Sequence, residues 1–226
     1  MKMSASLKKQ EIIAGSLYGV FQFLLLPSIA LFLNYFIKMP EWALQVAVFG
    51  MNFLCTILIF HRFLLSSCKS AIAAPFKVIG YSILGLILYY VGNLAVSFLI
   101  FTIRPDYLNL NDASISLMAD EGGLWIGLST VILVPVAEEC LFRGLLFRGF
   151  YDRSPVFAWI LSVCSFSAVH ILGYFGLYDG VELFLAFLQY LPAGLCLSFA
   201  YKASGTIIAP ILMHTLINMV GMIVLM

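Results

Sequence analysis

Two adjacent carboxylates and an arginine stand inside a long apolar run, where ionisable side chains are rare. Glu138 and Glu139 are followed four residues later by Arg143, within the run from 124 to 150. A charge at membrane depth costs about 3 kcal/mol by insertion scales, so such residues are functional candidates by default. On a helix, Glu139 and Arg143 share a face and can pair, whereas Glu138 points about 100° away. The spacing therefore predicts one paired acid and one unpaired acid.

Two histidines and an asparagine lie in later apolar runs and extend this set. His170 follows Phe166 by four residues, and Asn218 follows His214 by four residues. A carboxylate and an imidazole can activate a water molecule as general base, and an amide and an imidazole can donate to a developing oxyanion. Each feature alone also has a structural explanation, as an ion pair, a link between helices or a packing contact. A structural ion pair, however, does not require two further helices to bring His, His and Asn.

The composition predicts that these groups are positioned by a polytopic membrane protein. The chain has 226 residues, of which 63% are hydrophobic and 10% are charged, whereas soluble domains carry about 25% charged residues. The net charge of +1 gives no reason to expect nucleic acid as a partner. The five cysteines lie in or beside apolar runs without a CxxC pair, which indicates small buried hydrophobes rather than disulfides or metal ligands.

Seven apolar runs are each close to the ~20 residues that a helix needs to cross a ~30 Å hydrocarbon layer. We therefore expect an all-α transmembrane bundle forming one integral membrane domain over residues 1–226, with the motif residues in its half from about 124 to 226. The first run continues past Ala30, which favours a span over a cleaved signal peptide. The expected helices are at about 12–37, 42–65, 76–102, 124–150, 156–174, 181–201 and 206–226.

Basic and acidic loops alternate along the chain. The N-terminus and the second, fourth and sixth loops carry lysine or arginine, whereas the third and fifth loops are mainly acidic. Because cytoplasmic loops are enriched in basic residues, this pattern predicts a cytoplasmic N-terminus and an outer C-terminus. For the acidic third loop, 103–123, we favour a solvated segment over one that caps the bundle.

The three motifs together resemble the signature of a known family. Glu138-Glu139-x-x-x-Arg143, Phe166-x-x-x-His170 and His214-x-x-x-Asn218 occur in this order on separate expected helices. They are similar to the motifs of the CPBP family, the CAAX-processing and bacteriocin-processing (Abi-type) intramembrane proteases related to the type II CAAX prenyl endopeptidase. The resemblance covers roughly the C-terminal half of the chain and implies a glutamate-dependent peptidase. It assigns water activation to Glu138 and His170, the oxyanion hole to His214 and Asn218, and a supporting role to Glu139 and Arg143.

The resemblance also sets expectations for cofactors, partners and location. We expect no cofactor; zinc is the less favoured alternative, because two histidines and a glutamate could hold it but no HExxH is present. The expected partners are the lipid bilayer and a peptide or lipidated-protein substrate, and CAAX proteins, leader peptides and quorum-type peptides all fit. The expected location is a prokaryotic plasma membrane with the site toward the cytoplasm.

Two other classes of protein remain as alternatives. A non-catalytic bacteriocin-immunity or scaffold protein could retain the motifs for stability. A proton-coupled transporter is disfavoured, because the acids and histidines have no inverted-repeat counterpart in the first three helices.

Depth along the helices tests the grouping of these residues. At ~1.5 Å per residue, Glu138 and His214 both lie ~10–12 Å from the cytoplasmic face, but His170 lies ~21 Å from the start of its helix. Either that helix begins later or is strongly tilted, or His170 is outside the site.

Overall fold

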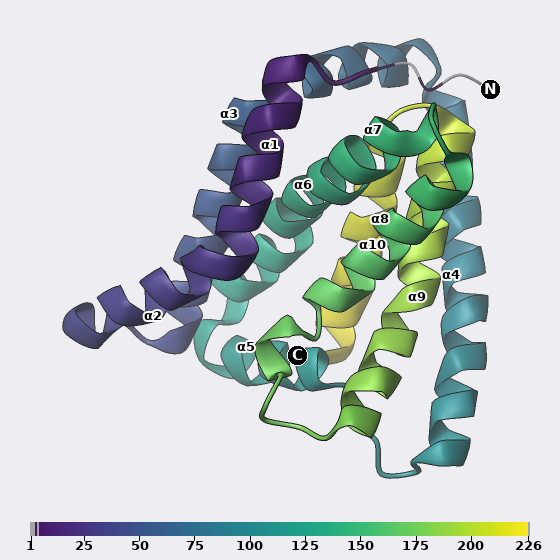
Figure 1. Cartoon of the computed structure of the whole chain (residues 1–226). Helices are drawn as coiled ribbons and strands as arrows, with labels where there is room; N and C mark the ends of the chain where they lie inside the picture. Colours follow the sequence, from purple (N-terminus) through teal and green to yellow (C-terminus); the bar gives the residue numbers. More distant parts are fainter. Residues whose placement is uncertain (1–2, 4, 226) are drawn as a thin grey trace.

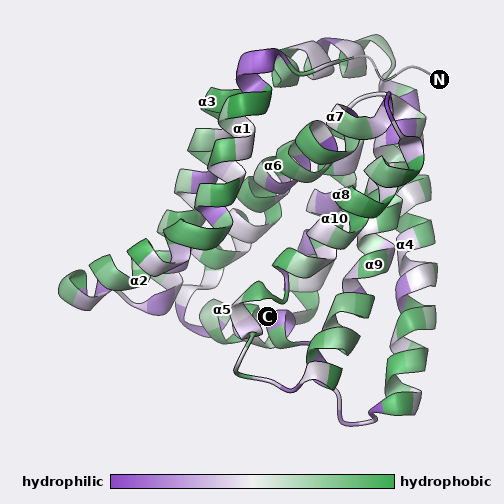
Figure 2. Ribbon diagram, in the orientation of Figure 1, coloured by the Kyte–Doolittle hydropathy of each residue, from purple (hydrophilic) through white to green (hydrophobic). Residues whose placement is uncertain are grey.

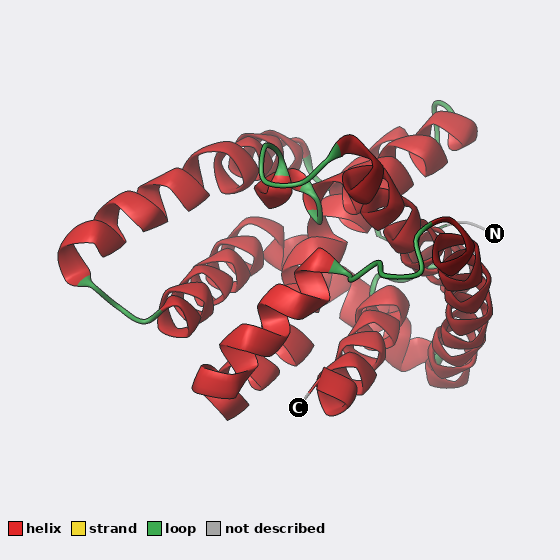
Figure 3. Ribbon diagram, turned by 90° about the horizontal axis from the view of Figure 1, so that it is seen from below, coloured by secondary structure: helices red, strands yellow, loops and turns green. Residues whose placement is uncertain are grey.

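The computed structural model describes residues 3 and 5–225, and this part of the chain is a bundle of helices joined by loops, without a β-strand (Figures 1 and 3). Two of its long helical segments, Lys9–Ile37 and Leu110–Tyr151, are interrupted by π-helical turns, in which each N–H bonds five residues back. The elements are α1 (Lys9–Val20), the π-turn η1 (Phe21–Leu25), α2 (Leu26–Ile37), α3 (Glu41–Ala73), α4 (Pro75–Ile103), α5 (Leu110–Leu128), the π-turn η2 (Ser129–Leu133), α6 (Val134–Glu139), the π-turn η3 (Cys140–Phe147), α7 (Arg148–Tyr151), α8 (Pro155–Val169), the 3₁₀ turn η4 (Leu172–Tyr174), α9 (Gly180–Ser204) and α10 (Ile208–Leu225).

These elements join into seven continuous helical segments within the described residues, as the hydropathy pattern predicts. Five segments are long and apolar enough to cross a membrane, and two shorter apolar helices complete the set. Hydrophobic residues cover the length of most helices (Figure 2). Such an apolar surface is stable in lipid and not in water, so the chain is an integral membrane protein. The two shorter apolar helices are Pro155–Val169 and Ile208–Val224.

The acidic segment before the fourth span differs from its prediction. We expected a solvated loop over 103–123, but α5 begins at Leu110, and only 104–109 are irregular. Asn109 caps the helix by accepting a hydrogen bond from the Asp112 backbone N–H at 3.0 Å. One face of this helix packs inward through Leu110 and Ala119, while its acidic side chains are exposed. The segment therefore caps the bundle as an amphipathic helix, and Gly123, at φ +46°, breaks it from the membrane-crossing part.

Helix α3, the second expected span, also extends further than predicted. It bends instead of ending near residue 65. Phe60 has non-helical backbone angles (φ −100°, ψ 16°), and the helix changes direction there and crosses one end of the bundle (Figure 1). The bend frees the backbone N–H of Phe63, which donates to the buried Glu11 carboxylate at 3.0 Å. Glu11 thus replaces a helical hydrogen bond that the bend removes.

Contacts between loops agree with the predicted alternation of charge. At one end, Arg148 donates to the carbonyl of Ala5 at 3.2 Å, and Lys202 lies over the Tyr151 ring at 4.4 Å. At the other end, Arg104 pairs with acids of the fifth loop and of the start of α9, Asp179 at 3.4 Å and Glu182 at 3.7 Å. The N-terminal, fourth and sixth loops therefore lie together, and the third and fifth loops lie together. The cytoplasmic side stays a prediction.

Candidate active site

Glu139 and Arg143 form the predicted ion pair, and both side chains are fully buried. Arg143 Nη1 donates to Glu139 Oε1 at 2.8 Å, and Arg143 Nη2 donates to the carbonyl of Gly194 on α9 at 3.1 Å. The guanidinium also lies over the Phe166 ring at 4.5 Å. Arginine suits this position because its planar fork can pair, donate to a carbonyl and stack at once. The pair therefore joins the acid-bearing helix to α8 and α9.

His214 joins the two acids. Its Nδ1 lies 2.9 Å from Glu139 Oε1, and its Nε2 lies 4.0 Å from Glu138 Oε2. A carboxylate paired with Arg143 accepts hydrogen bonds, so Nδ1 carries the proton and donates it to Glu139. This contact fixes the ring so that Nε2 faces Glu138. The arrangement is the carboxylate–imidazole dyad that orients a catalytic histidine in other hydrolases.

Exposure separates the two acids. The Glu139 side chain is 0% exposed, whereas that of Glu138 is 18% exposed. Within the described residues, Oε2 of Glu138 and Oε2 of Glu139 are both buried without a hydrogen-bond partner, so exposure alone separates the two acids. A buried carboxylate oxygen without a partner is unusual in a folded protein and marks a site that binds something polar. Glu138 is thus the acid that a substrate or a water molecule can reach.

His170 belongs to the same cluster, which resolves the question of its depth. It is the residue at which α8 ends, and it interacts electrostatically with Glu138, His214 and Arg143. Its helix begins at Pro155, one residue before the predicted start, so a late start is not the explanation. Figure 1 shows that α8 is strongly inclined relative to α4. This inclination favours the tilted helix among the predicted alternatives.

Asn218 is less tightly joined to the cluster than predicted. It lies one helical turn beyond His214 on α10, and its Nδ2 donates to the backbone carbonyl of Thr130 at 2.8 Å. No hydrogen bond links it to the other five predicted residues in the described part of the chain. The Thr130 contact fixes the plane of the amide and leaves the second Nδ2 hydrogen for another acceptor.

Three contributors to the site could not be found from the sequence. Gly194 and Thr130 act through backbone carbonyls, which any residue supplies. The third, Tyr190, stacks on His170 with ring centroids 4.0 Å apart, and in this chain a tyrosine in an apolar helix gives no signal by itself. Phe166, by contrast, was part of a recognised motif, and its ring lies 5.8 Å from that of His214.

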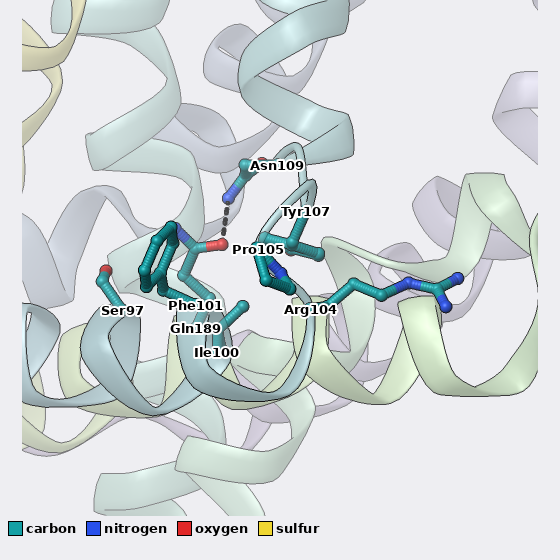
Figure 4. A pocket seen from close by; sticks show the side chains of 8 residues that line it. All are labelled: Ser97, Ile100, Phe101, Arg104, Pro105, Tyr107, Asn109 and Gln189. Carbon is teal, nitrogen blue, oxygen red and sulfur yellow. Dashed lines mark hydrogen bonds between the residues drawn. The ribbon is translucent and has the colours of Figure 1, made fainter.

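A cavity of about 320 Å³ lies apart from these residues, between α4, α9 and the loop before α5 (Figure 4). None of the six predicted site residues lines it. Tyr107 does, and burial, followed by the charges of Asp112 and Glu182, raises the pKa of its hydroxyl to about 12. The hydroxyl is therefore a neutral donor in this cavity near pH 7.

The zinc alternative requires that two histidines and a glutamate share one ion. Among the described residues, no three His, Cys, Asp or Glu side chains are placed to hold one metal ion. His214 Nδ1 and Glu139 Oε1 bond to each other. Metal independence stays a prediction.

Comparison with known families identifies the segment that carries these residues. Residues 120–220 match the family model described as type II CAAX prenyl endopeptidase Rce1-like. This segment is similar to Rce1-like endopeptidases. It contains all three motifs, so the match confirms the resemblance seen in the sequence. No curated protein and no solved structure matches the chain.

The matched segment includes the whole candidate site. It begins within α5 and ends within α10, and therefore includes every residue of the cluster described above. Helices α1, α3 and α4 contact it, as where Phe60 of α3 packs against Gly15 of α1 beside Leu145 of η3. Parts of the first three spans thus pack against the matched segment.

Proposed function

We propose that this protein is an intramembrane endopeptidase that hydrolyses a peptide bond with water activated by Glu138 and His170. The observation that carries the proposal is the contrast between the two acids. Glu139 is fully buried and paired with Arg143, whereas the Glu138 side chain is 18% exposed and lies 4.0 Å from His214 Nε2. The Rce1-like match supports protease chemistry for this cluster.

In the proposed reaction, Glu138 takes a proton from water while the water oxygen attacks the substrate carbonyl carbon. The carbonyl oxygen becomes an oxyanion in a tetrahedral intermediate. Protonated Glu138 then gives its proton to the leaving amine as the C–N bond breaks. One water is consumed, and one carboxylic acid and one amine are released.

His214 and Asn218 are the proposed oxyanion donors, and the cluster's charges suit this role. Because Nδ1–H of His214 is held by Glu139, the proposed oxyanion contact uses Nε2–H, which requires a ring that carries both protons. When Glu138 takes the proton from water, the cluster gains one positive charge, which matches the charge of the oxyanion.

The substrate and location are the finer part of the proposal. We propose a peptide or a lipidated protein cut near its C-terminus, in CAAX-type or leader-peptide processing, at the cytoplasmic side of a prokaryotic plasma membrane. We also propose that no metal takes part, because the dyad and Glu138 supply the base and the oxyanion donors by themselves.

The test uses the full-length protein in liposomes and two internally quenched probes, a farnesylated CAAX peptide and a leader peptide. Glu138→Gln should lower kcat at least ~100-fold, the range of a lost general base, without changing the melting temperature. Glu121→Gln, an exposed acid of the same helical segment, is the control and should behave as wild type. A metal chelator should have no effect.

Two outcomes would overturn the proposal. Cleavage by Glu138→Gln at more than about a tenth of the wild-type rate would contradict general-base catalysis by this residue. If the wild type cleaves neither probe nor a panel of cellular peptides, the non-catalytic scaffold or immunity alternative takes its place.

A further inference from the structure

The orientation of His170 is set by the last turn of its own helix together with α9. α8 ends at this residue, and the backbone N–H of His170 turns to the carbonyl of Ala168 instead of completing the helical bond to Phe166. The Phe166 carbonyl instead lies 2.8 Å from Nδ1 of the His170 ring. A carbonyl oxygen only accepts, so Nδ1 carries the proton, and Nε2 is left as an acceptor in the neutral ring.

An acceptor Nε2 is what water activation requires, and the neighbouring ring holds the imidazole in place. Tyr190 of α9 stacks on His170, with centroids 4.0 Å apart and planes 20° from parallel. The Phe166 ring contacts the same imidazole at 4.7 Å and 53°. Rotation of the imidazole about its side-chain bonds would break the stack and the Phe166 hydrogen bond together.

Tyr190 is itself anchored. Its hydroxyl donates to Asn109 Oδ1 at 3.2 Å, and the same oxygen accepts the Asp112 N–H that caps α5. Asn109 Nδ2 donates to Gln189 Oε1 at 2.9 Å, a bond drawn in the wall of the cavity in Figure 4. The amide of Asn109 thus connects the start of the acid-bearing segment to α9, and α9 to His170.

We propose that Tyr190 is a positioning residue, which keeps the His170 ring where Nδ1 donates to the Phe166 carbonyl and Nε2 stays free, with a smaller contribution from the hydroxyl contact to Asn109. The inference rests on the proposed function for its consequence in catalysis, but the tautomer is a property of the fold. The aromatic stack carries the larger effect and the hydroxyl the smaller one. Replacing Tyr190 by leucine should therefore disturb His170 more than replacing it by phenylalanine.

The experiment reads the ring directly. The chain has three histidines, so ¹⁵N-histidine labelling of the full-length protein gives three pairs of ring signals, assigned with His61→Gln and His170→Gln. In the wild type, His170 should show a protonated Nδ1 and an unprotonated Nε2. In Tyr190→Leu it should show mixed tautomers, whereas Tyr190→Phe should keep the wild-type pattern.

Kinetics with the farnesylated probe give the second readout. Tyr190→Leu should lower kcat ~10-fold and leave KM within ~2-fold, and Tyr190→Phe should stay within ~3-fold in both, the range expected for loss of one aromatic pair. Tyr178→Leu is the matched control, because its ring contacts Tyr174 and not His170.

The outcomes separate the two proposals. Wild-type ring signals and wild-type kcat in Tyr190→Leu would overturn the positioning role. If the wild type cleaves no probe while Tyr190→Leu still mixes the tautomers of His170, the proposed function fails and the positioning contact stands. A uniform loss of all three histidine patterns in Tyr190→Leu would indicate general unfolding and would also overturn the role.

Discussion

The buried pair of Glu139 and Arg143 predicts a strong and non-additive effect on stability. Arg143→Met removes the partner at 2.8 Å and leaves a carboxylate that is 0% exposed, with His214 as its remaining donor. It also leaves the Gly194 carbonyl without its arginine contact. Breaking a buried ion pair from one side costs about 3–5 kcal/mol, because the other charge stays buried. Glu139→Gln should cost a similar amount, since it leaves the guanidinium buried and unpaired.

The double variant should recover much of this loss. With Glu139→Gln and Arg143→Met together, no unpaired charge remains, and glutamine can still accept from His214 Nδ1. Replacing a buried pair by neutral groups is often near neutral, so we expect the double variant to be more stable than either single variant by about 2 kcal/mol.

Thermal unfolding of the detergent-solubilised full chain measures this cycle. For a protein of this size, each 1 kcal/mol shifts Tm by about 2–4 °C, so each single variant should melt about 10 °C below wild type. Glu138→Gln is the control, because the exposed acid should change Tm little. The reasoning is refuted if Arg143→Met melts within ~2 °C of wild type, or if the two single effects simply add in the double variant.

Two further predictions concern helix contacts outside the acid pair. Gly194→Ala should destabilise the protein by about 1–3 kcal/mol through overpacking, because its Cβ would lie 3.0 Å from Val163 Cγ1 and 3.3 Å from the Val163 backbone. Gly180→Ala is the control, because the space around Gly180 is open. Equal melting temperatures of the two variants would contradict the close approach of Gly194 to Val163. Hydrogen bonds from the backbone N–H groups of Glu182 and Val181, together with the nearby Arg104, lower the pKa of Asp179. The contribution of Asp179 to folding stability is therefore present above the unfolded pKa of about 3.9 and is lost as pH falls through the folded pKa. Asp179→Ala should therefore lower Tm at pH 7 and have little effect near pH 3, and a Tm difference that does not change with pH would exclude this cap.

Much of the site was predictable because membrane chemistry makes polar residues rare. The helical period alone placed Glu139 and Arg143 on one face, and the π-turn that carries Arg143 did not disturb the pair. The six predicted site residues have few other reasons to lie in lipid. For this reason the contact between Glu139 and Arg143 and the convergence of both histidines could be predicted. The bend at Phe60 and the helix over 110–122 were missed. Hydropathy does not detect a helix break inside an apolar run, and an amphipathic helix with exposed acids has the composition of a loop.

The parts that depend on the backbone or on close packing had no signal in the sequence. Gly194 contributes a carbonyl, and Thr130 contributes another. The contact between Tyr190 and His170 depends on the angle between α8 and α9, which no spacing of residues reveals. The depth estimate for His170 was misleading for the same reason, because counting residues assumes helices parallel to the membrane normal.

The short helix α8 has a consequence for the surrounding lipid. Its 15 residues extend ~22 Å, whereas the 29 residues of α4 extend ~44 Å. The chain beyond His170 is irregular, and polar backbone of this kind is tolerated at depth only beside protein or water. We expect hydrophobic mismatch on the α8 side, so that the bilayer thins locally and the aqueous phase comes closer to the centre of the bundle. A hydrolytic reaction inside a membrane needs such a supply of water.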